Sequence, residues 1–244
     1  MGLLDSEPIP RRTMVLFFVV DTSGSMSGSK IGSVNTTISD ILPELKDISE
    51  ENADAQIKIA ALEFSSGAKW LYDKPIEADS FRWNDLNAGG ITDFGEACKM
   101  LNQKLSRSAF MGDAVGSFAP VIILLSDGEP TDNYKKELDS LKENNWFKAA
   151  IKIAIAIGDD AKQEVLKEFT GNIECVLFAN NPTVLKKMIR FASLTASQIG
   201  SKSSNAGVVS KQDEMGKKLQ DFVINDLPNS QDTQSSSDIN IDGW

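Results

Sequence analysis

The chain has 244 residues, of which 41% are hydrophobic and 25% are charged, as in soluble globular proteins of one domain or one domain plus a tail. The formal net charge of -10 repels phosphate backbones and anionic membrane surfaces, so we expect neither nucleic acid nor a membrane as a general partner. The chain contains no histidine, which excludes Ser-His-Asp and Cys-His catalysis.

The first strong pattern is a continuous apolar run at residues 14–20, typical of a central parallel strand that is covered on both faces. Apolar residues then recur at three- and four-residue steps from Ile31 to Ile48, which predicts a helix. Ser29 is the predicted N-cap of this helix, and Pro43 should kink or locally distort it.

Residues 56–64 and 68–73 predict two strands joined by a Ser-Ser-Gly turn, and this short connection favours an antiparallel hairpin. The patterns that follow are, in chain order, a helix marked by Phe94 to Leu105, a strand at 121–126, a helix marked by Tyr134 to Leu141, a strand at 151–158, a helix at 161–169, a strand at 175–179 and a long helix marked by Val184 to Ile199.

This alternation predicts an α/β fold with a doubly wound, mostly parallel central sheet, one antiparallel edge strand and helices on both faces. We place the domain at residues 11–200. Residues 201–244 are rich in Ser, Asn, Gln and Asp, and we expect a polar, flexible tail. Within this tail, the apolar spacing predicts one short helix near 212–224.

The two cysteines, Cys98 and Cys175, lie far apart in apolar patterns and are expected to be buried free thiols of a reducing compartment. The first residues show no apolar leader segment. We therefore expect a cytoplasmic protein.

The first strand runs straight into the sequence DTSGSMSGSK at residues 21–30, which is compatible with a phosphate loop, a serine nucleophile or a metal site. A Walker loop needs glycines with four residues between them and an adjacent lysine, whereas Gly24 and Gly28 are separated by three. A nucleophile elbow needs a serine midway between two glycines, and Met26 stands there. An aspartyl-phosphatase motif fails as well, because Ser23 replaces its second acid.

The metal interpretation remains. Asp21, Ser23 and Ser25 are spaced i, i+2, i+4 in a loop that leaves a strand tip, and their hard oxygens suit Mg²⁺, Mn²⁺ or Ca²⁺. The strand at 121–126 also ends beside an acid, Asp127, and Thr92 precedes a predicted helix. If the two strands are neighbours, both carboxylates face one crevice, where they repel each other unless a cation lies between them.

The sequence DTSGS resembles the D-x-S-x-S signature of von Willebrand factor A (vWA) domains that carry a metal-ion-dependent adhesion site. GGITDFGEA resembles the threonine loop of that family, and LLSDGEPTD its aspartate loop. The resemblance covers roughly residues 11–199. Among its members, the chain looks most like bacterial TerY-like proteins linked with tellurium resistance. One departure is Ile91, which separates Gly90 from Thr92 where many relatives have threonine directly after a glycine.

The resemblance implies that Ser23 and Ser25 ligate the metal directly, that Asp21 and Thr92 contribute directly or through water, and that Asp127 holds a coordinated water. It implies a metal-dependent protein-interaction module without enzymatic activity, in which an acidic side chain of a partner completes the coordination. A stress-response adaptor with kinase-like or phosphatase-like partners is the leading expectation. The alternatives are a subunit that recruits clients to an AAA-type ATPase and, from another class, a Mg²⁺-dependent phosphotransfer enzyme, which would need a base or nucleophile that does not stand out.

Overall fold

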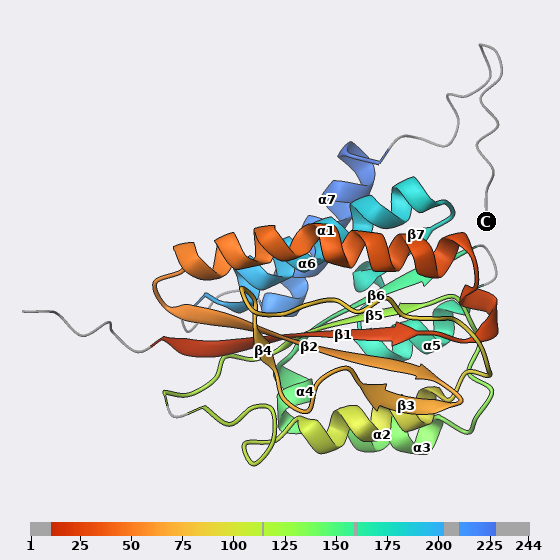
Figure 1. Ribbon diagram of the computed structural model, residues 1–244, viewed down its shortest axis with the longest axis horizontal. Helices are drawn as coiled ribbons and strands as arrows, with labels where there is room; N and C mark the ends of the chain where they lie inside the picture. Colours follow the sequence, from red (N-terminus) through yellow and green to blue (C-terminus); the bar gives the residue numbers. More distant parts are fainter. Residues whose placement is uncertain (1–10, 114, 159–160, 203–209, 228–244) are drawn as a thin grey trace, which may run out of the picture.

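Figure 1 shows the computed structural model, a central sheet with helices on both sides. The structure describes residues 11–113, 115–158, 161–202 and 210–227. Within these ranges no helix is long and apolar enough to cross a membrane.

The sheet contains β1 (Arg12–Asp21), β2 (Ala55–Ser65), β3 (Gly67–Trp70), β4 (Ile76–Glu77), β5 (Val121–Ser126), β6 (Ile151–Ile157) and β7 (Val176–Ala179). Its spatial order is β3-β2-β1-β5-β6-β7, and β4 also pairs with β2. Strands β2, β1, β5, β6 and β7 run parallel, whereas β3 and β4 are antiparallel to β2. The predicted fold class is confirmed, and the short strand β4 is an addition to the predicted elements.

The helices are α1 (Ser29–Glu51), α2 (Phe94–Lys104), α3 (Lys135–Lys142), α4 (Asn145–Ala149), α5 (Gln163–Thr170), α6 (Pro182–Gly200) and α7 (Lys211–Asn225). In Figure 1, α1, α6 and α7 lie on one side of the sheet, and α2 and α3 lie on the other. The short helix α4 was not expected from the apolar pattern, because Phe147 is its one buried residue.

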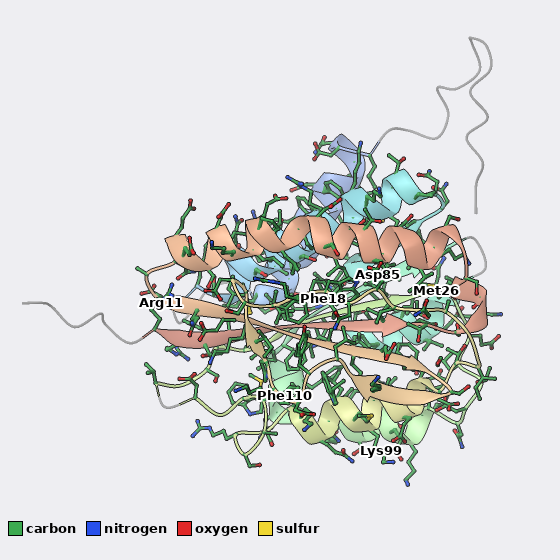
Figure 2. The ribbon with its side chains drawn as sticks, in the orientation of Figure 1. Arg11, Phe18, Met26, Asp85, Lys99 and Phe110 are labelled. Carbon is green, nitrogen blue, oxygen red and sulfur yellow. The ribbon has the colours of Figure 1, made fainter. Side chains whose placement is uncertain are left out.

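The strand β1 explains the two-sided core, because Met14 to Val20 are at most 1% exposed. Successive side chains point to opposite faces of a strand, so alternate residues of β1 enter two separate apolar clusters. Figure 2 shows Phe18 on the side of α1 and Phe110 on the side of α2. This double burial holds the carboxyl end of β1 in a fixed position.

One local prediction for α1 needs correction. The residue before the helix is Gly28, with a φ of 80°, and Ser29 is the first helical residue rather than the N-cap. A positive φ at this position favours glycine over serine. Pro43 lies inside α1, which runs from Ser29 to Glu51 (Figure 1).

The helix α7 packs against α6 and the sheet. Met215 and Leu219 are fully buried, and the ring of Phe222 stacks on Phe191 with centroids 4.1 Å apart. The side chain of Gln212 accepts a hydrogen bond from the backbone N–H of Lys152 at 2.8 Å and donates to its carbonyl at 2.9 Å. The Gln212 side chain thus bonds to the backbone of β6 at a position that β7 does not reach. The flexibility predicted for residues 203–209 and 228–244 concerns positions outside the described residues.

Cys98 and Cys175 are both buried and free, as expected from their apolar surroundings. Burial raises the pKa of the Cys98 thiol, and it raises the pKa of Cys175 to about 12. Neither thiol is therefore poised for reaction at neutral pH.

Candidate metal centre

The centre is built at the carboxyl edge of the sheet, where β1 and β5 end side by side. These strands are parallel neighbours in a register that pairs Val20 with Leu125. Asp21 is the last residue of β1, and Asp127 directly follows β5. The adjacency required by the sequence argument is therefore present, and the two acids reach the same crevice.

Asp21 has no exposed surface, and its carboxylate is held at both oxygens. Its Oδ1 accepts a hydrogen bond from the backbone N–H of Ser23 at 2.8 Å, and its Oδ2 accepts one from Ser126 Oγ at 2.6 Å. Burial raises the pKa of Asp21, the charge of Asp127 adds to this effect, and the two serines oppose it. The negative charge of the buried Asp21 carboxylate is therefore unfavourable, and a cation bound nearby would stabilise it.

The hydroxyls of the loop after β1 form a chain that leads to the second acid. Ser23 Oγ lies 3.1 Å from Ser25 Oγ, and Ser25 Oγ donates to Asp127 Oδ1 at 2.7 Å. A short 3-10 turn at Gly24–Met26 bends the loop, and the fully buried side chain of Met26 anchors it to the core. Figure 2 shows Met26 at this end of the sheet.

Backbone hydrogen bonds tie the threonine loop to both other loops. Gly24 N–H donates to the carbonyl of Gly90 at 3.0 Å. Thr92 N–H donates to Thr131 Oγ1 at 3.0 Å, and Thr131 N–H donates to the Thr92 carbonyl at 2.9 Å. Among the hydrogen bonds of the described residues, none uses Thr92 Oγ1, so this hydroxyl oxygen is free to accept a ligand.

Oxygens from two of the loops surround a point next to Gly128, which belongs to the third loop. A Cβ atom placed on this glycine would lie 3.5 Å from Thr92 Oγ1, 3.6 Å from Asp21 Oδ2 and 3.8 Å from Ser25 Oγ. The absence of a side chain at Gly128 keeps this space open. The structure thus brings the five predicted residues into one cluster: Asp21, Ser23, Ser25, Thr92 and Asp127.

Sequence reasoning missed a cation in the cluster. Lys30, in the first turn of α1, places its Nζ 2.5 Å from Asp127 Oδ2, and the Asp127 side chain is fully buried. Its signal in the sequence is only that it is the first basic residue after the hydroxyl-rich loop. Two supporting hydroxyls, Ser126 and Thr131, were also missed, because each acts by orienting a ligand or a loop rather than by facing the crevice.

Asp93 is the N-cap residue of α2. It precedes α2, but its side chain makes no capping hydrogen bond. Its Oδ2 instead accepts the backbone N–H of Gly67 at 2.7 Å, which ties the threonine loop to the turn between β2 and β3. The residue therefore supports the loop.

The donor set fits a hard divalent cation. Over the part of the chain that the structure describes, no group of three or more His, Cys, Asp or Glu side chains could hold a metal. A cation at this edge must therefore rely on hydroxyl oxygens together with two carboxylates. This chemistry suits Mg²⁺ and Mn²⁺ better than softer metals.

The family model for the von Willebrand factor type A domain matches residues 16–191, which include all five residues of the cluster. The chain belongs to the vWA domain family. Proteins of this family are typically protein-binding modules, and some carry a metal-ion-dependent adhesion site.

Curated relatives of this vWA domain are much longer proteins. Inter alpha-trypsin inhibitor heavy chain 4 of Mus musculus is 30% identical over 132 residues, covering 51% of this chain and 13% of the relative. Inter-alpha-trypsin inhibitor heavy chain H6 of Homo sapiens is 25% identical over 177 residues, covering 66% of this chain and 13% of the relative. The similarity is thus confined to a small part of each relative.

Solved structures share the fold at low sequence identity. A von Willebrand factor type A protein from Catenulispora acidiphila has a TM-score of 0.56 and 18% identity, covering 77% of this chain and 43% of that one. The ArnB paralog VWA2 from Sulfolobus acidocaldarius has a TM-score of 0.52 and 21% identity, covering 71% and 43%. Proximal thread matrix protein 1 from the mussel byssus, described with a zinc-occupied MIDAS motif, has a TM-score of 0.54 and 18% identity, covering 75% and 48%.

Proposed function

We propose that this vWA domain is a metal-dependent protein-interaction module that holds Mg²⁺, or Mn²⁺ or Ca²⁺, at the carboxyl edge of its sheet. The observation that carries the proposal is the convergence of Thr92 Oγ1, Asp21 Oδ2 and Ser25 Oγ on one point beside Gly128. Oxygens of two loops that are far apart in sequence meet there beside Gly128, a residue of the third loop. Turn formation alone would not require all three loops to face the same space.

Each residue has a distinct role in this proposal. Ser23 and Ser25 would ligate the cation directly, Asp21 and Thr92 would ligate it directly or through water, and Asp127 would hold a coordinated water. When bound, the cation would supply a positive charge. Neutral hydroxyl ligands would offset little of this charge. An acidic side chain of a partner would therefore gain a charge-assisted bond at the remaining coordination position.

An exposed apolar residue stands beside this position. Ile91 precedes Thr92 in the threonine loop and is 53% exposed. A protein partner would cover this side chain while its carboxylate reached the metal, so the metal contact and apolar burial would form one interface. This arrangement favours a protein ligand over a free small acid.

The type of vWA protein to which this domain belongs is also a proposal. We place the domain among cytoplasmic adaptors of the TerY-like type, without enzymatic activity, in a stress-response system with kinase-like or phosphatase-like partners. Its support is the resemblance of residues 11–26 to that group and the lack of any histidine to serve as a catalytic base.

Affinity capture with the full chain tests the proposal. Partners should be retained in Mg²⁺ and released by chelator, and Ser25→Ala or Thr92→Ala should abolish capture while the circular dichroism spectrum is unchanged. Ser27→Ala is the matched control, because Ser27 is an exposed serine of the same loop that lies outside the cluster. Capture that is indifferent to chelator and to both variants would show that binding does not use this centre.

A further inference from the structure

A second candidate site lies at the opposite end of the sheet from the metal centre. A cavity of about 810 Å³ opens there between the starts of β1 and β6, the segment before β5, and helices α4, α5 and α7. Figure 2 shows Arg11 and Met26 at opposite ends of β1, and the cavity is lined by Arg12, next to Arg11. The proposed protein-binding function does not involve this end of the molecule.

The lining of this cavity is basic, although the chain as a whole has a net charge of -10. One carboxylate, from Glu168, faces five cations. These cations are Arg12, Lys142, Lys148, Lys152 and Lys211. A concentration of positive charge in a concave, partly apolar site raises the local concentration of anions.

Two of these cations are neutralised by neighbours, and three are not. Lys142 lies 3.5 Å from Asp139, and Lys148 lies 2.8 Å from Glu143. Among the ion pairs of the described residues, none includes the remaining cations, which are Arg12, Lys152 and Lys211. These three cations are therefore available to an anionic ligand.

Lys152 is the deepest of the three, with 9% of its surface exposed. Its Nζ donates to the carbonyls of Phe147 at 3.0 Å and Ala150 at 3.1 Å, so its partners within the described part of the chain are neutral. Burial lowers the pKa of this amine. A buried cation is normally paired, and an anion bound in the cavity would supply the missing partner.

Arg12 and Lys211 form a fixed pair on one aromatic ring. The Arg12 guanidinium lies 4.0 Å from the centroid of Phe118, and Lys211 Nζ lies 5.4 Å from it. Two carbonyl groups, from Gly200 at 2.8 Å and Lys202 at 2.6 Å, accept hydrogen bonds from Lys211. Burial lowers the pKa of Lys211, and the nearby Arg12 charge adds to the effect. Two like charges held together in this way favour a ligand of more than one negative charge.

The apolar residues that line the cavity indicate the chemistry of the uncharged part of a ligand. Phe147 and Phe169 lie in the same wall, with their ring centroids 5.3 Å apart. The start of α7 closes the site and is fixed by the Gln212 side chain on β6, so the cavity is built by the packed domain. Its volume lies within the range of about 300–1,000 Å³ that is usual for small-molecule sites.

We propose that this cavity binds a small phosphate ester with an aromatic or apolar body, with Arg12, Lys152 and Lys211 binding the phosphoryl oxygens. A small molecule fits better than a peptide because the unpaired cations and the aromatic rings share one concave volume. The site is separate from the metal centre and does not depend on it.

Isothermal titration calorimetry of the full chain with ADP and with pyrophosphate, in the presence of EDTA, tests the proposal. ADP should bind in a saturable, salt-sensitive manner and more tightly than pyrophosphate. Lys211→Met and Lys152→Met should each weaken ADP binding by about tenfold, the loss of one charge-assisted contact. Lys46→Met is the matched control, since Lys46 is 46% exposed on α1 and pairs with Glu50.

The outcomes of this experiment can be distinguished from a loss of folding and from an effect of the metal centre. Because Lys152 is buried, its variant is checked by thermal unfolding, and the more accessible Lys211→Met carries the test if Lys152→Met does not fold. No saturable binding of ADP, or an equal loss in Lys46→Met, would overturn the site. If pyrophosphate bound as tightly as ADP, the proposal that the ligand has an aromatic or apolar body would be wrong. A glutamate-rich peptide that binds more tightly than ADP would assign the cavity to an acidic protein segment instead.

Discussion

Lys30 Nζ lies 2.5 Å from Asp127 Oδ2, so the buried acid of the aspartate loop has a cation from the first turn of α1 as its partner. The same carboxylate accepts a hydrogen bond from Ser25 through its other oxygen. Lys30 therefore offsets part of the negative charge that the centre presents, and a bound divalent cation would experience repulsion from it. The lysine links the stability of the metal-free domain to its metal affinity.

Replacement of this lysine should change the two properties in opposite directions. Without metal, Lys30→Met should lower the free energy of unfolding by about 1–3 kcal/mol, because a buried charged acceptor loses its partner. With saturating Mg²⁺, the gain in stability should be larger than in the wild type, because the repulsion is gone. Urea unfolding in EDTA and in Mg²⁺ measures both values.

The control for this variant is Lys46→Met, which removes a lysine of the same helix that pairs at the surface with Glu50 at 3.5 Å. It should change neither quantity by more than about 0.5 kcal/mol. A smaller Mg²⁺ effect in Lys30→Met than in the wild type would mean that Lys30 assists metal binding rather than opposing it.

The helix α7 should contribute to the stability of the domain through one aromatic residue. Phe222 is 7% exposed and stacks on Phe191 of α6. Phe222→Ala should therefore lower the free energy of unfolding by about 3–5 kcal/mol. The neighbouring Ile224 is 70% exposed, and Ile224→Ala should change it by no more than about 0.5 kcal/mol. Equal effects of the two changes in chemical denaturation would contradict the packing of α7 described above.

Asp113 should produce an acid-dependent loss of stability. Thr13 Oγ1 donates to Asp113 Oδ2 at 2.6 Å, and Lys58 Nζ lies 3.4 Å from the same oxygen. The hydrogen bond from Thr13 lowers the pKa of Asp113 below its ordinary value of 3.8. A carboxyl group with a depressed pKa in the folded state stabilises the fold above its unfolded pKa, and this contribution is lost as the pH falls through the folded pKa.

Asp113→Asn should therefore cost about 0.5–1.5 kcal/mol at neutral pH, and the difference from the wild type should shrink below about pH 4. Denaturant unfolding at a series of pH values measures this difference. Asp40→Asn, at an exposed position of α1, is the control and should change the free energy of unfolding at neutral pH by no more than about 0.5 kcal/mol. A gap for Asp113→Asn that widens as the pH falls would show that the sign of the pKa shift is wrong.

The sequence predicted the elements that bury continuous apolar runs, because such runs have few alternative placements. The run that ends at Asp21 and the strand that ends beside Asp127 indicated one crevice, and the sheet places them side by side. The cap of α1 was predicted wrongly, since Ser29 is a good capping residue type but Gly28 alone adopts the positive φ that the turn requires.

Long-range side-chain pairs were beyond prediction. Lys30 meets Asp127 across 97 positions, and Gln212 meets Lys152 across 60. In sequence, both are ordinary polar residues of amphipathic helices, and only the packing of α1 and α7 on the sheet gives them partners. The basic cavity was missed for the same reason, because Arg12, Lys152 and Lys211 come from three separated segments.

The central claim is that hydroxyls and two carboxylates at the carboxyl edge of the sheet hold a divalent cation. The most direct measurement is thermal unfolding of the wild type and of Ser25→Ala in Mg²⁺ and in EDTA. At a free Mg²⁺ concentration ten times its dissociation constant, the wild type should gain about 1.4 kcal/mol, and Ser25→Ala should gain markedly less. A wild-type melting curve that is the same in Mg²⁺ and in EDTA would contradict the account.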